Sequence, residues 1–367
     1  MLFSENLDKI VYERYKLHKC DDIVIVSGYV GPEPIRQISK LPIHTTVIYG
    51  MYGCDGIGQA LHNALIKEDN EFPNVDIYYS EMPVHSKIYM WRHKGEVIHA
   101  LIGSANFSTN GLTTPNKETL AETTADTFSA MDAYLKRIQQ RWIRCTDTKV
   151  ILKNKPKEPK VTDFPVFNPD VCSMPLFIIE QGEEVIQKGN GLNWGMAKLL
   201  GAHVNINDAC IAIPAEISSR YENMFPQKRL TPTNTDNLAR RDHRDNDPID
   251  IIWDDGTTMT GLLEGTRTKT VDGVKVEYAK QIATTPSKAL LGKYIRARLG
   301  VPEGQAITMD DLKKYGRKTI DISLLGEGVY YFDFSVDGGN EGGIKYDVLD
   351  GPVSLVAEDP APYNTKK

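Results

Sequence analysis

Several features that reveal a protein's class are missing from this sequence of 367 residues. No apolar run approaches the ~20 residues that a membrane-spanning helix needs. The N-terminus has no apolar stretch of the kind found in signal peptides. The five cysteines are widely spaced and form no CxxC pair, a pattern that disfavours zinc and is typical of reduced thiols. We therefore expect a soluble, cytoplasmic protein with no membrane partner and no bound metal.

An excess of positive charge is also missing. The sequence has 43 Lys and Arg against 49 Asp and Glu, a formal net charge of −6. Neither the first 150 residues nor the remainder is basic overall. This excludes a simple polycationic nucleic-acid binder but allows a local basic groove. The apolar content of 41% is typical of globular proteins, and the length suits two domains.

The first part of the chain alternates between short β-branched runs and segments with helical spacing. This alternation predicts an α/β fold. We expect strands at residues 23–26, 46–49, 74–79, 87–91 and 97–102, and helices at 33–40, 58–66 and 127–144.

A change in composition divides the chain. Residues 153–168 begin with a Lys- and Pro-rich stretch without periodicity, which predicts an extended linker; a loop within one domain is the alternative. We therefore assign residues 1–152 and 169–367 to two domains. The second has short strands, at 176–179, 209–213, 249–253, 258–263, 274–278 and 329–334, and helices at 288–298 and 309–315. This pattern predicts a mainly β barrel or sandwich.

One set of polar residues suits attack on a phosphodiester. His85 and Lys87 alternate and so face the same side of a strand, as do Ser104 and Asn106 in the segment that follows the next strand. A neutral imidazole can attack phosphorus while cationic and amide donors hold the non-bridging oxygens, and no metal is then required. Glu118 can fix the tautomer of a histidine. The alternative is a structural hairpin with incidental polar residues.

These residues, written His85-x-Lys87, Gly103-Ser104-x-Asn106 and Asn116-x-Glu118, resemble the HKD motif of the phospholipase D superfamily. The resemblance covers roughly residues 20–145 and implies a phospholipase D-like α/β fold. It departs from the motif at Arg92, where an aspartate is expected. That departure is typical of the nuclease branch rather than the lipid-cleaving branch.

The motif occurs once, since no other HxK is present in the chain. Enzymes of the superfamily join two such motifs at one active site. The resemblance therefore implies a homodimer with one shared site. His85 of one protomer would be the nucleophile, forming phosphohistidine, and His85 of the other would be the general acid.

The second domain carries polar loops suited to reading base edges in the major groove, although each loop alone is more simply a solvated turn. In order along the chain they resemble the B3-like DNA-recognition domain of several restriction endonucleases. The resemblance spans roughly residues 170–335, with an N-arm at 187–208 and a C-arm at 264–285. It points to six candidate DNA contacts: Asn193, Asn207, Arg267, Lys269, Lys280 and Gln281. Lys157 and Lys160 of the linker are weaker candidates for phosphate contact.

Together the two parts resemble restriction endonucleases of the BfiI and NgoFVII types. The resemblance implies a homodimer that cleaves double-stranded DNA at specific sites without a metal or other cofactor. Some members work with a separate ATP-dependent helicase-like subunit, and no GxxxxGK[ST] occurs in this chain. Two alternatives remain: a phospholipase or phosphatidyl transferase, and a DNA-binding regulator with an inactive nuclease-like domain.

Overall fold

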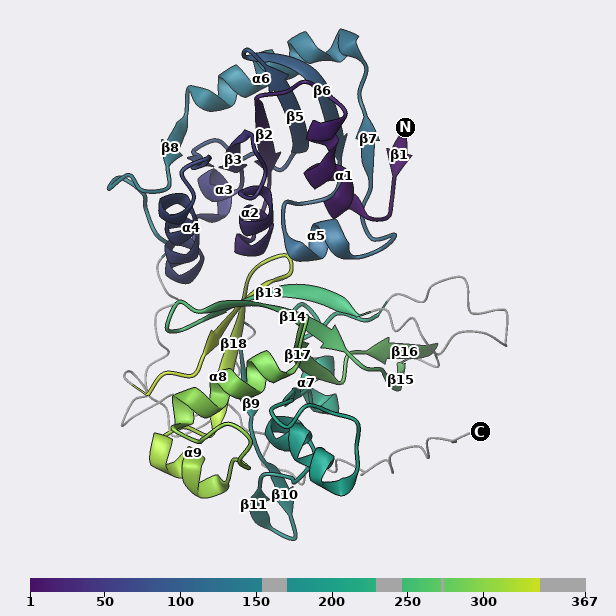
Figure 1. Ribbon diagram of the computed structural model, residues 1–367, viewed down its shortest axis with the longest axis vertical. Coiled ribbons are helices and arrows are strands. Elements are labelled where there is room, and N and C mark those ends of the chain that lie inside the picture. Colours follow the sequence, from purple (N-terminus) through teal and green to yellow (C-terminus); the bar gives the residue numbers. More distant parts are fainter. Residues whose placement is uncertain (154–169, 229–245, 272–273, 337–367) are drawn as a thin grey trace.

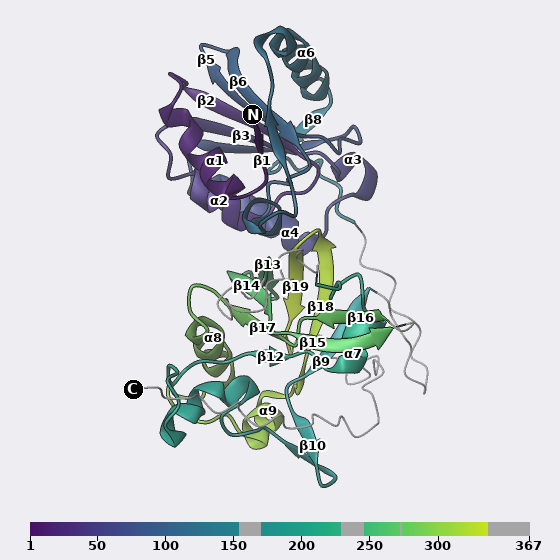
Figure 2. The same ribbon diagram turned by 90° about the vertical axis from the view of Figure 1, so that its right-hand side faces the viewer.

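The computed structural model describes residues 1–153, 170–228, 246–271 and 274–336. The chain forms two domains stacked end to end, each built on its own large sheet (Figures 1 and 2). Of the proposed linker only residue 153 is described, so Lys157 and Lys160 lie outside the described residues. No helix in the described part of the chain is long and apolar enough to cross a membrane.

The N-terminal domain has an eight-stranded sheet with the order β1-β7-β6-β5-β2-β3-β4-β8. β2, β3 and β4 are parallel, and β5 joins β2 in the antiparallel sense. The strands are β1 (Leu2–Phe3), β2 (Asp22–Ser27), β3 (His44–Tyr49), β4 (Val75–Ser80), β5 (Lys87–His93), β6 (Glu96–Gly103), β7 (Leu120–Glu122) and β8 (Trp142–Arg144).

Helices cover both faces of this sheet (Figure 2). α6 (Phe128–Gln139) packs its buried residues Met131, Leu135 and Ile138 on one face. The other helices gather on the opposite side: α1 (Leu7–Glu13), α2 (Pro32–Ile38), α3 (Tyr52–Asp55), α4 (Gln59–Glu71) and α5 (Thr109–Thr113), with the 3-10 turn η1 (Arg14–Lys16). A second 3-10 turn, η2 (Ala125–Thr127), leads directly into α6. The predicted α/β architecture is therefore present.

One predicted helix is shorter than expected. The apolar spacing over residues 127–144 predicts a single helix, but α6 ends at Gln139 and Trp142 begins β8. The Trp142 ring stacks on Tyr78 of β4, with ring centroids 3.9 Å apart. Pairing and stacking at the sheet edge therefore outweigh helical periodicity at this end.

The C-terminal domain has a seven-stranded sheet with the order β12-β17-β14-β13-β19-β18-β9. Neighbouring strands of this sheet pair in the antiparallel sense, except β13 and β19, which are parallel. The domain's strands are β9 (Val171–Pro175), β10 (Ile178–Glu180), β11 (Glu183–Val185), β12 (Ile211–Ala212), β13 (Asp247–Trp253), β14 (Thr258–Glu264), β15 (Arg267–Val271), β16 (Val274–Tyr278), β17 (Gln281–Thr284), β18 (Thr319–Gly326) and β19 (Val329–Asp333).

This domain also contains η3 (Gly191–Leu200), α7 (Ala215–Arg220), α8 (Ala289–Leu299) and α9 (Met309–Tyr315). The predicted helices at 288–298 and 309–315 are confirmed by α8 and α9, and Thr308 caps α9 through a capping box with Asp311. Other elements differ from expectation. Residues 176–179 do not form one strand. The elements without a counterpart among the predicted ones are β9, β11, β15, β17, β18, α7 and η3.

The two domains share apolar and polar contacts. Ile252 and Val329 of the second domain are buried in the core cluster of the first. Asp250, almost fully buried, accepts hydrogen bonds from the backbone N–H and hydroxyl of Thr109, at 3.2 and 2.7 Å. The side chain of Asn110 donates to the carbonyl of Pro248 at 3.1 Å. The second domain therefore packs against α5, which follows the segment that carries Asn106.

Candidate active site

The HxK segment and the segment after β6 meet at one end of the N-terminal sheet. Lys87 opens β5 and pairs with Gly103 at the end of β6, so Ser104 and Asn106 follow directly beside it. His85 lies in the extended segment just before β5 and is exposed. Sheet pairing thus brings together residues that the sequence separates by about twenty positions.

His85 and Lys87 are in direct contact. Nζ of Lys87 lies 3.0 Å from Nδ1 and 3.2 Å from Nε2 of His85, and it donates to the His85 carbonyl at 2.8 Å. Lys87 is only 7% exposed. Burial lowers the pKa of its ammonium, and the charges of Glu327 and Glu118 partly offset that effect. A group that contacts His85 at this end therefore also meets the ammonium of Lys87.

The amide of Asn106 is oriented by the chain behind it. Its Oδ1 accepts from the backbone N–H of Tyr29 at 3.2 Å and lies 3.4 Å from the hydroxyl oxygen of Ser27. The same hydroxyl donates to the Tyr29 carbonyl at 2.6 Å and accepts from the N–H of Phe107 at 2.9 Å. With Oδ1 engaged in this way, the NH₂ group of Asn106 is left to donate into the site.

Gly28 makes room for this arrangement. A Cβ atom at position 28 would lie 3.1 Å from Cδ2 of His85 and 3.4 Å from Oδ1 of Asn106. The ring of Tyr29 meets that of His85 edge-on, with centroids 6.0 Å apart, and its hydroxyl donates to Asp55 at 2.7 Å. The turn after β2 is thus a second wall of the site, one that the HxK motif alone does not indicate.

Ser104 and Glu118 belong to the same end of the sheet. The Ser104 hydroxyl accepts from the N–H of Thr119 at 3.1 Å, and its own N–H donates to the Thr119 carbonyl at 3.0 Å. Ser104 therefore fixes the segment that carries Glu118. Glu118 acts on the site through its charge, which partly offsets the lowering of the Lys87 pKa by burial. Its predicted role in orienting a histidine stays a prediction.

Two residues outside the predicted set complete the site. Asn106 Nδ2 donates to Oε2 of Glu327 at 3.0 Å, and Nζ of Lys117 lies 2.9 Å from Oε1 of the same carboxylate. Burial alone would raise the pKa of Glu327, but Lys117, Asn106 and Lys87 outweigh it and lower that pKa. Lys117 stands inside the Asn116-x-Glu118 signature and could have been recognised there. Glu327 comes from the other domain, and no local pattern indicates it.

Arg92, at the position where the motif has an aspartate, lies away from this site. It belongs to the opposite end of β5, where it pairs with Asp22 at 3.5 Å and donates to the Gly95 carbonyl at 2.7 Å. Its side chain braces a turn rather than the catalytic residues.

The DNA-contact candidates in the N-arm are structural. Asn193 is 1% exposed, and its amide donates to the Ile307 carbonyl and accepts from the Ile307 N–H, both at 2.8 Å. Asn207 is buried as well, accepts from the N–H of Gly304 at 2.7 Å and donates to Glu303 at 3.0 Å. Burial and these hydrogen bonds argue against a contact of the two side chains with DNA, and that contact stays a prediction.

The C-arm candidates are more open. They lie on or beside the β15–β16 hairpin, which projects from the sheet in Figure 1. Lys269 is exposed, with its ammonium on the Ser219 hydroxyl, and Lys280 is exposed beside Gly265. Arg267 donates to the Ile213 carbonyl, and Gln281 donates to Glu264. All four stay predictions, with the two lysines best placed to meet a phosphate.

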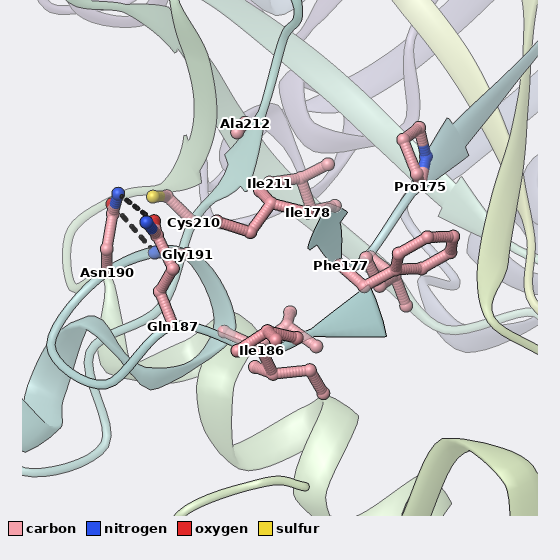
Figure 3. A pocket seen from close by; sticks show the side chains of 13 residues that line it. Pro175, Phe177, Ile178, Ile186, Gln187, Asn190, Gly191, Cys210, Ile211 and Ala212 are labelled. Atoms are coloured by element: carbon pink, nitrogen blue, oxygen red, sulfur yellow. Dashed lines mark hydrogen bonds between the residues drawn. The ribbon is translucent and has the colours of Figure 1, made fainter. Parts of the chain in front are cut away.

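A pocket that is open to solvent lies at the base of the β10–β11 hairpin (Figure 3). Its wall is mainly apolar and includes Phe177, Ile186 and Ile211. Its polar side chains Gln187 and Asn190 are hydrogen-bonded to each other at 2.9 Å. None of the catalytic candidates lines this pocket. Among the described residues, no group of three or more His, Cys, Asp or Glu is placed to hold a metal ion.

Family comparisons agree with both halves of this description. Residues 5–152 match the NgoFVII restriction endonuclease N-terminal PLD domain, and residues 171–325 match the NgoFVII C-terminal B3-like DNA-binding domain. The chain belongs to the NgoFVII restriction endonuclease family. The predicted fold class, a phospholipase D-like domain followed by a B3-like domain, is confirmed. Membership in this family indicates an endonuclease whose partner is DNA.

Two solved structures match part of this chain. NucT from Helicobacter pylori is 15% identical, with a TM-score of 0.29, and the match covers 39% of this chain and 97% of that one. Nuc from Salmonella typhimurium, a phospholipase D family member, is 11% identical, with a TM-score of 0.26, and the match covers 37% and 88%. None of the curated proteins matches this sequence.

Proposed function

We propose that this member of the NgoFVII family is a sequence-specific, type II-like endonuclease that cleaves double-stranded DNA without a metal ion. The observation that carries the proposal is the convergence of His85, Lys87 and Asn106 at one end of the N-terminal sheet. That convergence occurs in a chain whose other half matches a DNA-binding domain.

The chain's own residues can supply each step. An imidazole nitrogen of His85 attacks phosphorus, and the bond from phosphorus to the leaving oxygen breaks, which leaves a phosphohistidine. Lys87 and Asn106 donate to the non-bridging oxygens as negative charge grows on them. The leaving oxygen takes a proton from His85 of the partner subunit. A water molecule then attacks the phosphohistidine, gives its proton to that second imidazole, and frees the nucleophile.

The surface around the motif supports a shared site. His85, Gly103 and Ser104 are exposed, and Ile102 beside them is a large apolar side chain that is 41% exposed. This face is therefore accessible to a second chain. Because the sequence holds one HxK motif, a second copy of the chain would supply the second histidine.

The direct test is incubation of the purified protein with plasmid DNA in EDTA, followed by sequencing of the ends. We expect discrete ends from the wild-type chain and none from His85→Ala, which should still bind the same DNA. His44→Ala is the matched control, because His44 is a partly exposed histidine paired with Asp76 at the opposite end of the parallel strands. Cleavage that persists in His85→Ala would contradict the proposal, and binding without any cleavage would favour an inactive regulator.

The shared site has its own test. Wild-type chains are mixed with an increasing fraction of His85→Ala chains, the subunits are allowed to exchange, and cleavage of target DNA is assayed. A site built from two protomers predicts activity that falls with the square of the wild-type fraction, whereas independent sites predict a linear fall. Sedimentation of an active monomer would also contradict the dimer.

Partners and setting follow from the same proposal. The exposed lysines of the C-arm would touch the DNA backbone, and a separately encoded ATP-dependent helicase-like subunit is the partner to supply in the same assay. All five cysteines are free thiols, which suits the reducing cytoplasm in which we expect the enzyme to act.

A further inference from the structure

The turn between β18 and β19 reaches from the DNA-binding domain into the catalytic site of the other domain (Figures 1 and 2). It is a two-residue turn, Glu327-Gly328, between strands that pair through Gly326 and Val329. Leu325 packs against the core of the N-terminal domain, and Val329 is buried in it. The tip of this hairpin is therefore docked on the catalytic domain.

Two glycines let the turn approach closely. A Cβ atom at Gly328 would lie 2.4 Å from Cβ of Asn110, and one at Gly326 would lie 3.2 Å from the ring of Tyr29. Gly328 also has φ +72°, which favours glycine. Side chains at either position would move the carboxylate of Glu327 away from the site. The tight fit fixes where that carboxylate lies.

The carboxylate lies among donors suited to a phosphate. Asn106 Nδ2 donates to one of its oxygens at 3.0 Å, and Lys117 Nζ is 2.9 Å from the other. Lys87 is near enough for its charge to act on the same carboxylate. An amide and two ammonium groups around one anion form the donor set that a phosphodiester needs when it is attacked by the adjacent His85.

We propose that Lys117 is a third phosphate donor beside Lys87 and Asn106, which the proposed mechanism already assigns to the non-bridging oxygens, and that Glu327 occupies this phosphate-binding subsite in the DNA-free chain. The inference rests on the proposed nuclease function and deepens it. Lys117 becomes a second phosphate-binding cation beyond the HxK lysine. Glu327 becomes a competitor that must leave, with its hairpin, before DNA can be cut. Because the hairpin belongs to the DNA-binding domain, binding of the target sequence is the event that can withdraw it.

The test begins with Glu327→Gln, which keeps the shape and removes the charge. We expect cleavage of DNA that lacks the target site to rise at least about tenfold, because a charge-assisted competitor is weakened. Glu183→Gln is the matched control, since Glu183 is an exposed carboxylate of the same domain at the start of β11. That variant should cleave as the wild-type chain does.

Lys117→Gln is the second variant of the test. It should lower cleavage of target DNA about tenfold or more in both the wild-type and Glu327→Gln backgrounds, because the cation would act on substrate and not only on Glu327. Binding is read separately with a short oligonucleotide without the target site and His85→Ala as background. Adding Glu327→Gln should tighten that binding by a similar factor, and adding Lys117→Gln should weaken it.

The outcomes are separable. If the wild-type chain cuts DNA but Glu327→Gln leaves both off-target cleavage and oligonucleotide binding unchanged, the subsite inference is overturned while the nuclease stands. If Glu327→Gln loses cleavage with an unchanged thermal unfolding midpoint, the carboxylate assists the reaction and the inference is overturned as well. If the wild-type chain and His85→Ala are equally inactive on target DNA, the proposed function itself fails.

Discussion

The two domains differ in how their functional residues are distributed along the sequence. In the N-terminal domain the five catalytic candidates lie within a stretch of 34 residues, from His85 to Glu118, and pairing of β5 with β6 brings the first four together. In the C-terminal domain the candidates spread over nearly ninety positions. The structure commits two of them, Asn193 and Asn207, to the interior. A hairpin motif is therefore a more reliable guide than a polar loop.

The reason lies in what each kind of site requires. A phosphodiesterase needs few groups in fixed geometry, so alternation on two paired strands nearly defines the site. A DNA-reading surface needs polar side chains that remain available, and availability depends on burial. An asparagine in a Gly-rich loop can face the groove of DNA or form hydrogen bonds with the backbone of another loop. The local sequence looks the same in both cases.

The largest expected effect separates the domains by function. Lys87→Ala should lower cleavage by about 10³-fold or more, because the ammonium beside His85 is lost. Affinity for target DNA, measured by gel shift, should stay within about threefold of wild type because reading belongs to the other domain. Lys136→Ala is the control, since Lys136 lies exposed on α6 and pairs only along its own helix with Asp132. If Lys87→Ala lost DNA binding as well as cleavage, the functional division between the two domains would be contradicted.

The next effect concerns the contact between the domains. Burial raises the pKa of Asp250 to about 6, against the opposing hydrogen bonds from Thr109. The folded chain thus favours the protonated carboxyl. Its stabilising contribution is complete below about pH 4 and is lost as the pH rises through about 6, an effect of about 3 kcal/mol.

Asp250→Asn, which cannot ionise, should remove this pH dependence from urea unfolding measured between pH 4 and 7. Asp310→Asn is the control, because Asp310 is 93% exposed at its side chain. That control should keep the wild-type slope. A slope that survives in Asp250→Asn would show that the buried carboxyl is not its source.

The smallest expected effects compare a buried residue of the N-arm, Asn193, with an exposed residue of the C-arm, Lys269. Asn193→Ala should lower the free energy of unfolding by about 2–3 kcal/mol, because the N–H and carbonyl of Ile307 lose their partners, and the folded fraction should bind DNA normally. Lys269→Ala should leave unfolding unchanged, weaken DNA binding several-fold and reduce the salt slope by about 1. Urea unfolding and salt-dependent binding check both, and the reverse pattern would restore Asn193 as a DNA contact.

The sequence predicts the fold better than it predicts the edges of its elements. Strands and helices with clear periodicity, such as β2, β5 and α8, are found where they are expected. Errors occur where tertiary contacts compete with local pattern, as in β8, where Trp142 stacks on Tyr78. β18 is missed because one of its two pairing partners, β9, lies far away in the sequence, and local spacing does not record such pairing.

By itself the sequence determines the chemistry this chain can offer. His85, Lys87 and Asn106 stand at spacings that pairing of neighbouring strands converts into one site, so local geometry suffices. Only the tertiary structure decides what else reaches that site. Glu327 is more than two hundred positions away from Asn106, and it arrives because apolar packing of Leu325 and Val329 docks its hairpin on the other domain. Contacts between domains depend on burial and shape, which no local pattern records.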